Sequence, residues 1–416
     1  MKESARSLAR AALRRWRMGH EFADRIVAEI FAVTALGGPD RAFLLELFYG
    51  VLRNLTLLDF WIGQLRSEAV DLETRDLLRL GLYQVMFLET AAHAAVFETV
   101  ALSPRRARPV VNALLRRALR ERKGLTRSAG AQPPAVRYSQ PQFLIEKWSG
   151  QFGPAAALAL CRWNNQPAPV YARINQLKIS PPEFLRKYPD SSVFPSCSKF
   201  VRLAEVAAVA ASGDAYIQDP STALACELLH PGLGETILDA CAAPGGKSAY
   251  LAEMMSNTGT LIATDREEMR LARLRANLAR LRVANATTIV CDWADEESIR
   301  AAGLEKHSFD KIMLDAPCTN TGVMRRRVDL RWRLAPGDFA RMRSEQLTVL
   351  RRVARFLKPG GSLVYSTCSL EPEENEEVAS EFLESVAGFS LTTAKKSRPF
   401  SDGMDGAFAV RLHRGA

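Results

Sequence analysis

The sequence predicts a multidomain protein in which an all-helical N-terminal domain and a small α+β module precede an α/β domain of Rossmann type. Three observations support this fold class. Apolar residues first recur at helical spacing, prolines then interrupt mixed helical and extended patterns, and strands finally alternate with helices. We therefore expect domains at residues 1–125, 140–212 and 213–416, as the usual domain size suggests for a chain of 416 residues.

Two stripes of apolar side chains predict long helices in the N-terminal domain, because each recurs every three or four positions. They are formed by Leu44, Leu47, Phe48, Val51, Leu55 and Leu58, and by Leu77, Leu80, Leu82, Tyr83, Met86 and Phe87. The segment from Gly124 to Pro134 is rich in Gly, Ser, Gln and Pro, which predicts a linker. In the module that follows, residues 170–175 predict a strand.

Alternating strand and helix patterns predict the third domain. Strands are expected at 235–240, 260–265, 286–291, 309–315, 362–368 and 406–412, and helices at 247–256, 266–282, 341–357 and 373–385. The third of these helices should stop at Lys358-Pro359-Gly360-Gly361, because proline and glycine end helices. This alternation indicates a doubly wound, mostly parallel sheet, which binds ligands at the carboxyl ends of its strands.

Positive charge is concentrated in the N-terminal part of the chain. The net charge is +10, and residues 1–140 contribute 22 Lys and Arg against 14 Asp and Glu, a net +8. A dense group of cations lies near the end of this part: Arg105, Arg106, Arg108, Arg116, Arg117, Arg120, Arg122 and Lys123. Such a distribution favours a nucleic-acid partner. Helix faces that are basic only for solubility are the alternative.

Seven cysteines are spread along the chain, and none forms a CxxC pair. They are Cys161, Cys197, Cys226, Cys241, Cys291, Cys318 and Cys368. This distribution argues against a disulfide framework or a zinc site, so we expect a cytoplasmic protein without a bound metal. The apolar runs are short and interrupted by charge, which argues against a membrane span. A monomer is expected.

A glycine-rich turn from Asp239 to Lys247 follows the first predicted strand of the third domain. It lets a ligand approach backbone N–H groups at the start of a helix. Acidic residues follow the first three strands: Asp239, then Asp265, which suits a ribose diol, and Asp292, which suits an adenine amine. S-adenosylmethionine, an adenosine ligand that needs no phosphate cradle, fits this pattern best.

Two other nucleotide sites fit the turn less well. Gly246-Lys247-Ser248 resembles the end of an ATPase P-loop, but a P-loop requires glycine five residues before Gly246, where this chain has Cys241. The dinucleotide motif GxGxxG is not matched by Pro244-Gly245-Gly246 either. A turn with a purely structural role is the remaining alternative.

Two cysteines directly follow predicted strands of this domain, in Asp315-Ala316-Pro317-Cys318 and in Ser366-Thr367-Cys368-Ser369. A thiol beside a methyl donor suggests methylation at C5 of cytosine, which becomes nucleophilic only after a thiolate adds to C6. The thiol needs a neighbouring charge to ionise, and Lys247 is one candidate to supply it. The residues alone leave open which cysteine attacks. Two inert buried thiols are the alternative.

These motifs resemble those of the RNA cytosine-5 methyltransferases. The resemblance is carried by Asp239–Lys247, Asp315–Cys318, Ser366–Ser369, Ile217–Ser221 and Asp405–Phe408. In the helical domain, similarity to the antitermination factor NusB is carried by Phe48–Arg53, Gly81–Gln84 and Val111–Arg116. The combination is similar to the RsmB (Sun) family of bacterial ribosomal RNA methyltransferases.

The resemblance implies a role for each motif residue. Cys368 would be the nucleophile and Cys318 the thiol that assists product release, with Asp315 and Lys247 completing the catalytic set. The residues implied in S-adenosylmethionine binding are Cys241, Ala242, Ala243, Pro244, Gly245, Gly246, Lys247, Asp265, Asp292 and Asp315. The expected substrate is RNA, with small-subunit (16S) ribosomal RNA first and transfer RNA as the alternative. A non-catalytic NusB-type RNA-binding factor is the alternative outside the enzymes.

The chain departs from the family pattern in two places. Thr319-Asn320-Thr321-Gly322 stands where the family usually has Ser-Gly-Thr-Gly, and Gly406-Ala407-Phe408 stands where two bulky residues are more usual. Both changes could alter how the base is held, but neither removes a catalytic group. The segment from Met324 to Arg333 contains five arginines and Trp332, so we expect it to contact RNA.

Overall fold

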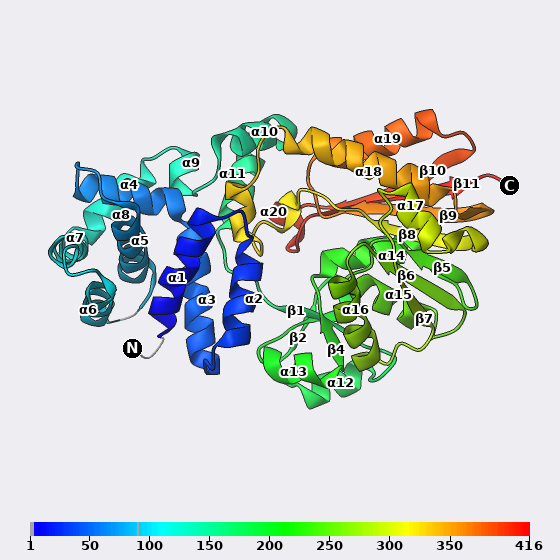
Figure 1. Ribbon diagram of the computed structural model, residues 1–416, viewed down its shortest axis with the longest axis horizontal. Coiled ribbons are helices and arrows are strands. Elements are labelled where there is room, and N and C mark those ends of the chain that lie inside the picture. Colours follow the sequence, from blue (N-terminus) through cyan, green and yellow to red (C-terminus); the bar gives the residue numbers. More distant parts are fainter. Residues whose placement is uncertain (1–3, 90) are drawn as a thin grey trace. The chain divides into compact units, whose positions relative to one another are not determined.

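The computed structural model describes residues 4–89 and 91–416, and the chain forms two compact units. Unit 1 contains Met1–Pro167 and Met324–Leu334, and unit 2 contains Ala168–Val323 and Ala335–Ala416. The domain boundaries predicted near residues 125 and 212 fall inside these units. The predicted combination of a helical domain, an α+β module and a mostly parallel α/β sheet is confirmed (Figure 1).

Unit 1 is helical, as predicted. Its helices are α1 (Ala5–Met18), α2 (Ala23–Val33), α3 (Gly38–Arg53), α4 (Leu55–Leu65), α5 (Leu72–Phe87), α6 (Ala92–Leu102), α7 (Arg108–Arg120), α8 (Arg122–Gly130), α9 (Pro134–Arg137), α10 (Gln142–Phe152) and α11 (Pro154–Asn164). Leu47, Phe48 and Val51 of the first predicted stripe are fully buried in its core. None of the helices in the described ranges is long and apolar enough to cross a membrane.

Two glycines allow α5 to pack closely against its neighbours in unit 1. A Cβ atom on Gly50 of α3 would lie 2.0 Å from Cζ of Tyr83, and one on Gly81 would lie 2.5 Å from Cδ1 of Leu115 on α7. Real Cβ atoms do not approach other heavy atoms so closely, because interiors are already packed to crystal-like density. Glycine is therefore required where these helices cross.

The linker predicted from Gly124 to Pro134 is wrong, because most of it is helical. Helix α8 buries Leu125 and Ala129, which lie one turn apart, in the core of unit 1. The indole N–H of Trp61 also donates a hydrogen bond to the carbonyl oxygen of Leu125 over 2.9 Å. Burial of these side chains outweighs the weak helix propensity of the glycine and serine residues around them.

The segment Met324–Leu334, here called the strap, belongs to unit 1 although it directly follows the Cys318 loop of unit 2 in sequence. The guanidinium group of Arg331 is fully buried and donates to the carbonyl oxygen of Asn164 (2.9 Å) and to Oδ1 of Asn165 (2.7 Å). The Trp332 indole donates to the carbonyl oxygen of Leu52 over 2.8 Å. The strap therefore fills part of the helical core.

The prediction that the strap contacts RNA is accordingly wrong for several of its side chains. Arg331 is fully buried, and Arg325 is almost so and stacks over the ring of Trp163 at 3.8 Å. The guanidinium of Arg333 donates to the carbonyl oxygen of Trp16 over 2.7 Å. Burial also lowers the pKa of Arg331 to about 9, because charge is costly in an apolar interior. Arg331 and Arg333 thus bind backbone carbonyls where phosphate was expected.

Unit 2 begins with a four-stranded antiparallel sheet in the order β2-β3-β1-β4. Its elements are β1 (Tyr171–Ile174), α12 (Pro181–Lys187), β2 (Ser192–Phe194), β3 (Cys197–Arg202), α13 (Val206–Ser212) and β4 (Ala215–Ile217). The strand predicted at 170–175 is β1. Arg173 of this strand is buried, pairs with Glu253 and lies 4.5 Å over the ring of Tyr250, which joins the small sheet to the rest of unit 2.

The larger sheet of unit 2 has seven strands in the order β10-β11-β9-β8-β5-β6-β7, and only β10 and β11 run antiparallel to their neighbours. The strands are β5 (Thr236–Asp239), β6 (Thr260–Asp265), β7 (Ala286–Val290), β8 (Phe309–Asp315), β9 (Leu357–Thr367), β10 (Phe389–Ser397) and β11 (Ala407–Arg414). All six predicted strands are present. Strand β10 was not predicted, because most of its side chains are exposed and polar.

Helices cover both faces of this sheet (Figure 1). They are α14 (Ala223–Leu229), α15 (Gly246–Met254), α16 (Glu268–Arg280), α17 (Glu296–Ala301), α18 (Asp338–Ala354) and α19 (Glu376–Ser385), while the short α20 (Pro399–Asp402) lies between β10 and β11 in sequence. Alternate residues of β8 face opposite layers: Ile312 packs with α18 and α19, whereas Met313 packs with α14 and α15. The predicted stop at 358–361 lies within β9.

Replacing Arg331 with Met should destabilise unit 1 by about 3 kcal/mol, because buried oxygen acceptors lose their donor. Urea unfolding of the full chain, followed by circular dichroism, measures the change. Arg327→Ala is a matched control in the strap, since Arg327 forms a solvent-exposed ion pair with Asp24, and it should cost below about 1 kcal/mol. Equal losses in the two variants would contradict the core role of Arg331.

Candidate active site

The glycine-rich turn lies between β5 and α15 of unit 2, at the carboxyl edge of the sheet. Gly245 has a φ of +101°, a backbone conformation that side chains disfavour, and its amide donates to the carbonyl oxygen of Ala242 over 2.8 Å. Asp239 ends β5 and is fully buried, and one of its carboxylate oxygens accepts a hydrogen bond from Ser248 over 2.6 Å. The turn therefore begins and ends on the same buried carboxylate.

The other two predicted acids lie on the strands beyond β5 in the same half of the sheet. Asp265 ends β6, is 3% exposed, and accepts the amide hydrogen of Ala243 over 3.3 Å, so it directly borders the turn. It also pairs with Arg270 at 3.2 Å. Asp292 lies just beyond β7 and is half-buried, and it accepts the amide hydrogen of Ala294 over 2.9 Å. All three carboxylates thus line one edge of neighbouring strands.

The carboxylates at this edge suit a ligand that carries a positive charge and hydroxyl groups. Oδ1 of Asp239 is buried and has no hydrogen-bond partner among the described residues. Burial, opposed by the bond from Ser248, raises the pKa of Asp239 to about 7. A ligand ammonium group would satisfy this oxygen, and the Asp265 carboxylate suits a diol. The residues therefore fit S-adenosylmethionine, whose amino acid and ribose offer those donors.

Lys247 and Asp315 link the turn to the strand that leads into the first cysteine loop. The ammonium group of Lys247 lies 2.7 Å from Oδ2 of Asp315, and Ser366 on β9 donates to the other carboxylate oxygen over 3.0 Å. Burial opposes the charge of Lys247, but Asp315 outweighs it and raises the pKa of the lysine. A charge on Cys368 would also raise the pKa of Lys247, so the ion pair lies within electrostatic reach of that thiol.

The two predicted cysteines meet at this edge. Their sulfur atoms are 3.3 Å apart, although the residues are separated by fifty positions in sequence. The Cys368 thiol also donates to Oδ1 of Asn320 over 2.9 Å, which leaves Cys318 as the donor within the thiol pair. The bond to Cys368, followed by burial, raises the pKa of Cys318 well above its usual value. Cys318 therefore keeps its proton at neutral pH.

The departures from the family pattern take part in this geometry. Asn320 has a φ of +59°, in the left-handed region that asparagine tolerates better than most residues, and its side-chain Nδ2 donates to the carbonyl oxygen of Cys318 over 2.6 Å. Gly322 donates its amide hydrogen to the carbonyl oxygen of Cys368 over 2.9 Å, and Gly406 donates to that of Gly322 over 2.9 Å. The second departure, Ala407, opens β11 beside this glycine contact.

The other two motifs of the sequence analysis also meet in unit 2. Oδ1 of Asp219 accepts the amide hydrogens of Ser221 and of Asp405, each over 3.0 Å. This contact anchors the start of β11 to the segment before α14. The motifs Ile217–Ser221 and Asp405–Phe408 are therefore joined through a single carboxylate.

Sequence reasoning missed Asn320 as a contact of Cys368, and it also missed Glu374 and Gln346. Glu374 and Gln346 are fully buried and hydrogen-bonded to the two cysteine loops. The sequence carries no signal for Glu374, because it lies in the acidic segment Glu371–Glu374 shortly after Cys368 and such segments are usually solvated. Gln346 lies in an ordinary helical pattern and offers no signal either.

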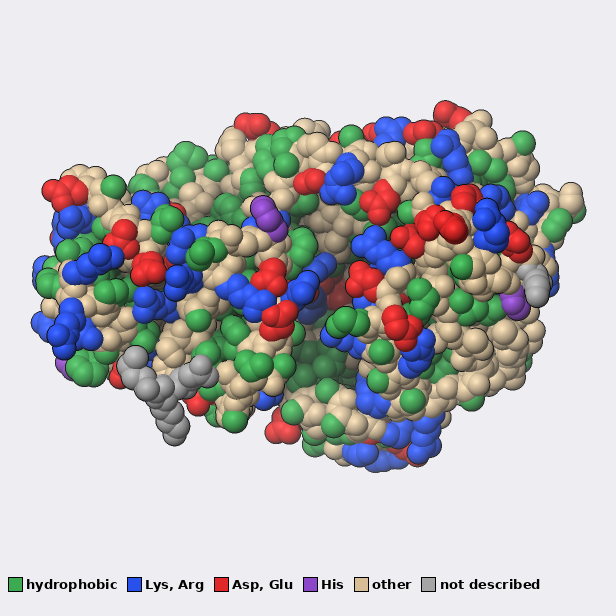
Figure 2. Space-filling model, in the orientation of Figure 1, with side chains coloured by type: hydrophobic (Ala, Val, Ile, Leu, Met, Phe, Trp, Pro, Cys, Tyr) green, Lys and Arg blue, Asp and Glu red, His purple; other side chains and the backbone are tan. Residues whose placement is uncertain are grey.

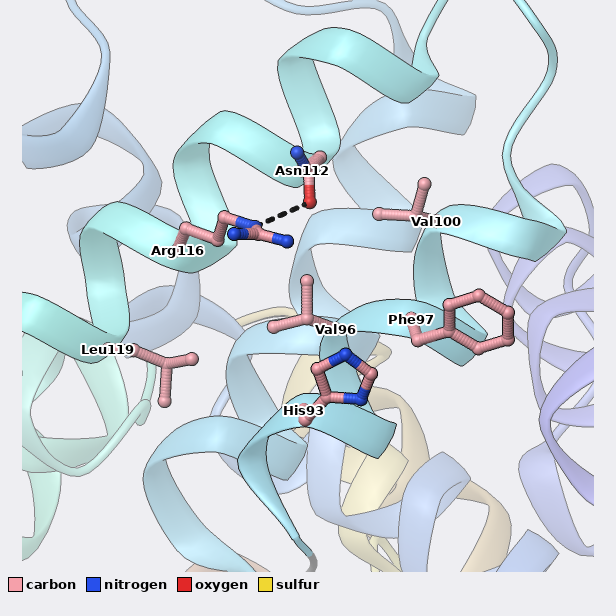
Figure 3. A pocket seen from close by; sticks show the side chains of 7 residues that line it. All are labelled: His93, Val96, Phe97, Val100, Asn112, Arg116 and Leu119. Atoms are coloured by element: carbon pink, nitrogen blue, oxygen red, sulfur yellow. Dashed lines mark hydrogen bonds between the residues drawn. The ribbon is translucent and has the colours of Figure 1, made fainter.

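Unit 1 carries two features outside this site. Lys and Arg side chains gather over the end of the unit where Figure 1 labels α7 and α8 (Figure 2), and all eight predicted cations there are exposed. A hollow between α6 and α7 is lined by Val96, Phe97, Val100 and the hydrogen-bonded pair Arg116 and Asn112 (Figure 3). Among the described residues around it, none carries a carboxylate or a thiol, so it offers no comparable chemistry.

Three sequence families match the chain. The family described as 16S rRNA methyltransferase RsmB/F matches residues 226–413, and the NusB family matches residues 3–120. A third family, described as an RsmF/B-like methyltransferase, ferredoxin-like domain, matches residues 140–202. The matches include both cysteine motifs, the basic helix α7 and strands β1 to β3 of the small antiparallel sheet.

Relatives are similar over most of this length. The probable ribosomal RNA small subunit methyltransferase B of Bacillus subtilis is 32% identical, covering 99% of this chain and 96% of that protein. The ribosomal RNA small subunit methyltransferase B of Vibrio cholerae is 33% identical, covering 92% and 89%. A crystal structure of a methyltransferase homolog protein from Pyrococcus horikoshii is 28% identical, with a TM-score of 0.59, over 68% of this chain and 97% of that one.

Replacing Asp239 with Asn should raise the melting temperature more at pH 8 than at pH 5, with a difference of at least about 3 °C. The folded-state pKa of about 7 lies above the ordinary 3.8, so the folded protein retains a proton that the unfolded chain releases, and the stability of the parent falls as pH rises between these values. Asparagine does not titrate, so the variant does not lose stability in this way as the pH rises. Thermal unfolding of parent and variant at several pH values measures this change in melting temperature, with Asp190→Asn at an exposed position as the control. A melting-temperature difference between Asp239→Asn and the parent that does not change with pH would contradict a protonated Asp239.

Proposed function

The chain belongs to the RsmB/F family of 16S ribosomal RNA methyltransferases, and we propose that it methylates C5 of a cytosine in small-subunit ribosomal RNA with S-adenosylmethionine as methyl donor. The observation that carries the proposal is the thiol pair. Cys318 and Cys368 lie 3.3 Å apart beside the Lys247–Asp315 ion pair, at the sheet edge where the acidic ligand turn also lies. Methylation at oxygen or nitrogen would require neither thiol.

The proposed chemistry begins with Cys368. C5 of cytosine is a poor nucleophile, and addition of the Cys368 thiolate to C6 turns the ring into an enamine that can attack an electrophilic carbon. Bound S-adenosylmethionine supplies that carbon as an activated methyl group. Asp315, held by Lys247 and Ser366, would accept a hydrogen bond from the base and orient it. The Lys247–Asp315 ion pair would thereby position the cytosine ring between Cys368 and the methyl donor.

Release requires two bonds to break. The C5 proton is lost to a base, and the bond between C6 and the Cys368 sulfur breaks as the aromatic ring re-forms. Cys318 retains its proton and lies 3.3 Å from that sulfur, so its thiol can donate a hydrogen bond to the departing thiolate. This gives the two cysteines different tasks.

The RNA would contact the exposed cations of α7 and α8 in unit 1. Arginine and lysine bind phosphate without reading sequence, so this surface would add affinity, and recognition of the target cytosine would be left to the site in unit 2. The base must leave any stack before the thiol can reach its C6 atom. A single-stranded or opened region of the RNA is therefore the expected target.

Deleting the gene should remove one bisulfite-protected cytosine from small-subunit ribosomal RNA, and the parent gene should restore it. Cys368→Ala should fail to restore it, because no thiolate can add to C6. Bisulfite sequencing of total RNA measures this. A cytosine that loses protection in transfer RNA instead would identify transfer RNA as the substrate. Protection unchanged everywhere would favour a non-catalytic RNA-binding factor.

Replacing Cys318 with Ala should slow release without preventing attack, so a covalent protein–RNA complex should accumulate. The thiol that stabilises the departing Cys368 sulfur is then missing. A shifted band on a denaturing gel that disappears after ribonuclease treatment measures the complex. Cys318→Ala/Cys368→Ala is the control and should form none. Rapid turnover of the single variant without a trapped complex would contradict the role of Cys318.

A further inference from the structure

Glu374 is a buried carboxylate that binds both cysteine loops. It lies in the short 3-10 turn Pro372–Glu374 after β9 and has no exposed surface. Its Oε2 accepts the amide hydrogen of Thr319 over 2.8 Å, and its Oε1 accepts the hydroxyl hydrogen of Ser369 over 2.7 Å. Thr319 directly follows Cys318 and Ser369 directly follows Cys368, so one carboxylate joins the two residues next to the thiols.

Two further donors complete the environment of this carboxylate. The Thr319 hydroxyl donates to Oε1, and the side-chain amide of Gln346 on α18 donates to Oε2 over 3.0 Å. The same Gln346 nitrogen donates to the carbonyl oxygen of Pro317 over 2.8 Å. Gln346 thus holds the residue before Cys318, while Glu374 holds the residue after it.

These donors are all neutral. Within residues 4–89 and 91–416, Glu374 forms no ion pair with a Lys or Arg side chain. A buried carboxylate is costly unless its lone pairs are filled, and hydrogen bonds to a charged acceptor are short and strongly directional. Four such bonds to groups on three separate segments hold those segments at defined distances.

We propose that Glu374 is a positioning residue that sets the separation of the Cys318 and Cys368 sulfur atoms through Thr319 and Ser369. The inference rests on the proposed function, because it gives the thiol separation a catalytic purpose. Neither sulfur is bound by Glu374 itself, so the carboxylate acts through the two neighbouring residues. A displacement of about 1 Å at a reacting group lowers rates by as much as about 100-fold.

The charge of Glu374 supports the same arrangement. It contributes to the raised pKa of Cys318, after the hydrogen bond to Cys368 and burial. The carboxylate therefore helps Cys318 to retain the proton that assists release. Length and charge of this side chain thus have separable effects.

Two conservative variants separate these effects. Glu374→Gln keeps the length: its oxygen can accept from Thr319 N and Gln346, and its NH₂ group can face the hydroxyls of Thr319 and Ser369, which are able to accept. Glu374→Asp keeps the charge but is one methylene too short to reach both loops. Glu376→Gln, at an exposed ion pair with Lys396, is the matched control.

Sulfur proximity is measured first, without any need for activity. The folded proteins are treated with diamide, which oxidises adjacent thiols, and formation of the Cys318–Cys368 disulfide is followed by mass spectrometry. Glu374→Asp should form it about tenfold more slowly than the parent, whereas Glu374→Gln and Glu376→Gln should match the parent. Equal rates in all four proteins, or a loss in Glu374→Gln as large as in Glu374→Asp, would overturn the proposal.

Turnover on ribosomal RNA is measured next. Glu374→Asp should lower kcat by about 10- to 100-fold with KM nearly unchanged, since the carboxylate has no exposed surface with which to bind cofactor or RNA. Glu374→Gln should retain most of kcat, and the pH at which its Cys318 reacts with iodoacetamide should fall. A parent without cytosine methylation would refute the proposed function, while the disulfide rates would still test the positioning role.

Discussion

Parallel pairing of β8 with β5 on one side and β9 on the other is the constraint on which the site depends. It aligns Asp239 with Met313 and Asp315 with Ser366, so three loops leave the sheet at one edge. The ligand turn, the first cysteine loop and the second cysteine loop are those three. Lys247 can then reach Asp315 from the turn, and the two thiols can meet although they lie on different strands. A slip of one residue in this register would turn those side chains to the opposite face.

Polar side chains hold the loops beyond the sheet, and most of them could not be assigned from sequence. The strands and the motifs at their ends were predictable, because buried parallel strands are continuous apolar runs and their carboxyl ends collect functional residues. Glu374 and Gln346 were not, since a buried carboxylate and an exposed one look alike in a sequence. The donors that permit burial of Glu374 come from residues 319, 346 and 369, and only the tertiary fold brings them together.

The same ambiguity explains the strap and α8. An arginine-rich segment after a catalytic loop is typical of phosphate binding, yet Arg331 binds backbone carbonyls in a helical core. Arginine offers five donors in either setting, and composition does not record which acceptor is present. In α8, glycine and serine suggested a linker, but Leu125 and Ala129 on one face were enough to bury it. Strand β10 was missed for the opposite reason, because its partner β11 stabilises a strand with few buried side chains of its own.

The strap has a consequence for the order of events during synthesis. A ribosome produces the N-terminal segment first, and domains generally begin to fold as soon as they emerge. Here the helical unit lacks one of its core segments until Leu334 has been made, long after Pro167. Until then the carbonyl groups that Arg331 binds stay hydrated, and the growing chain must carry an incomplete helical core through the synthesis of Ala168–Val323, the larger part of unit 2. The core of unit 1 can therefore be completed only after much of unit 2 has been translated.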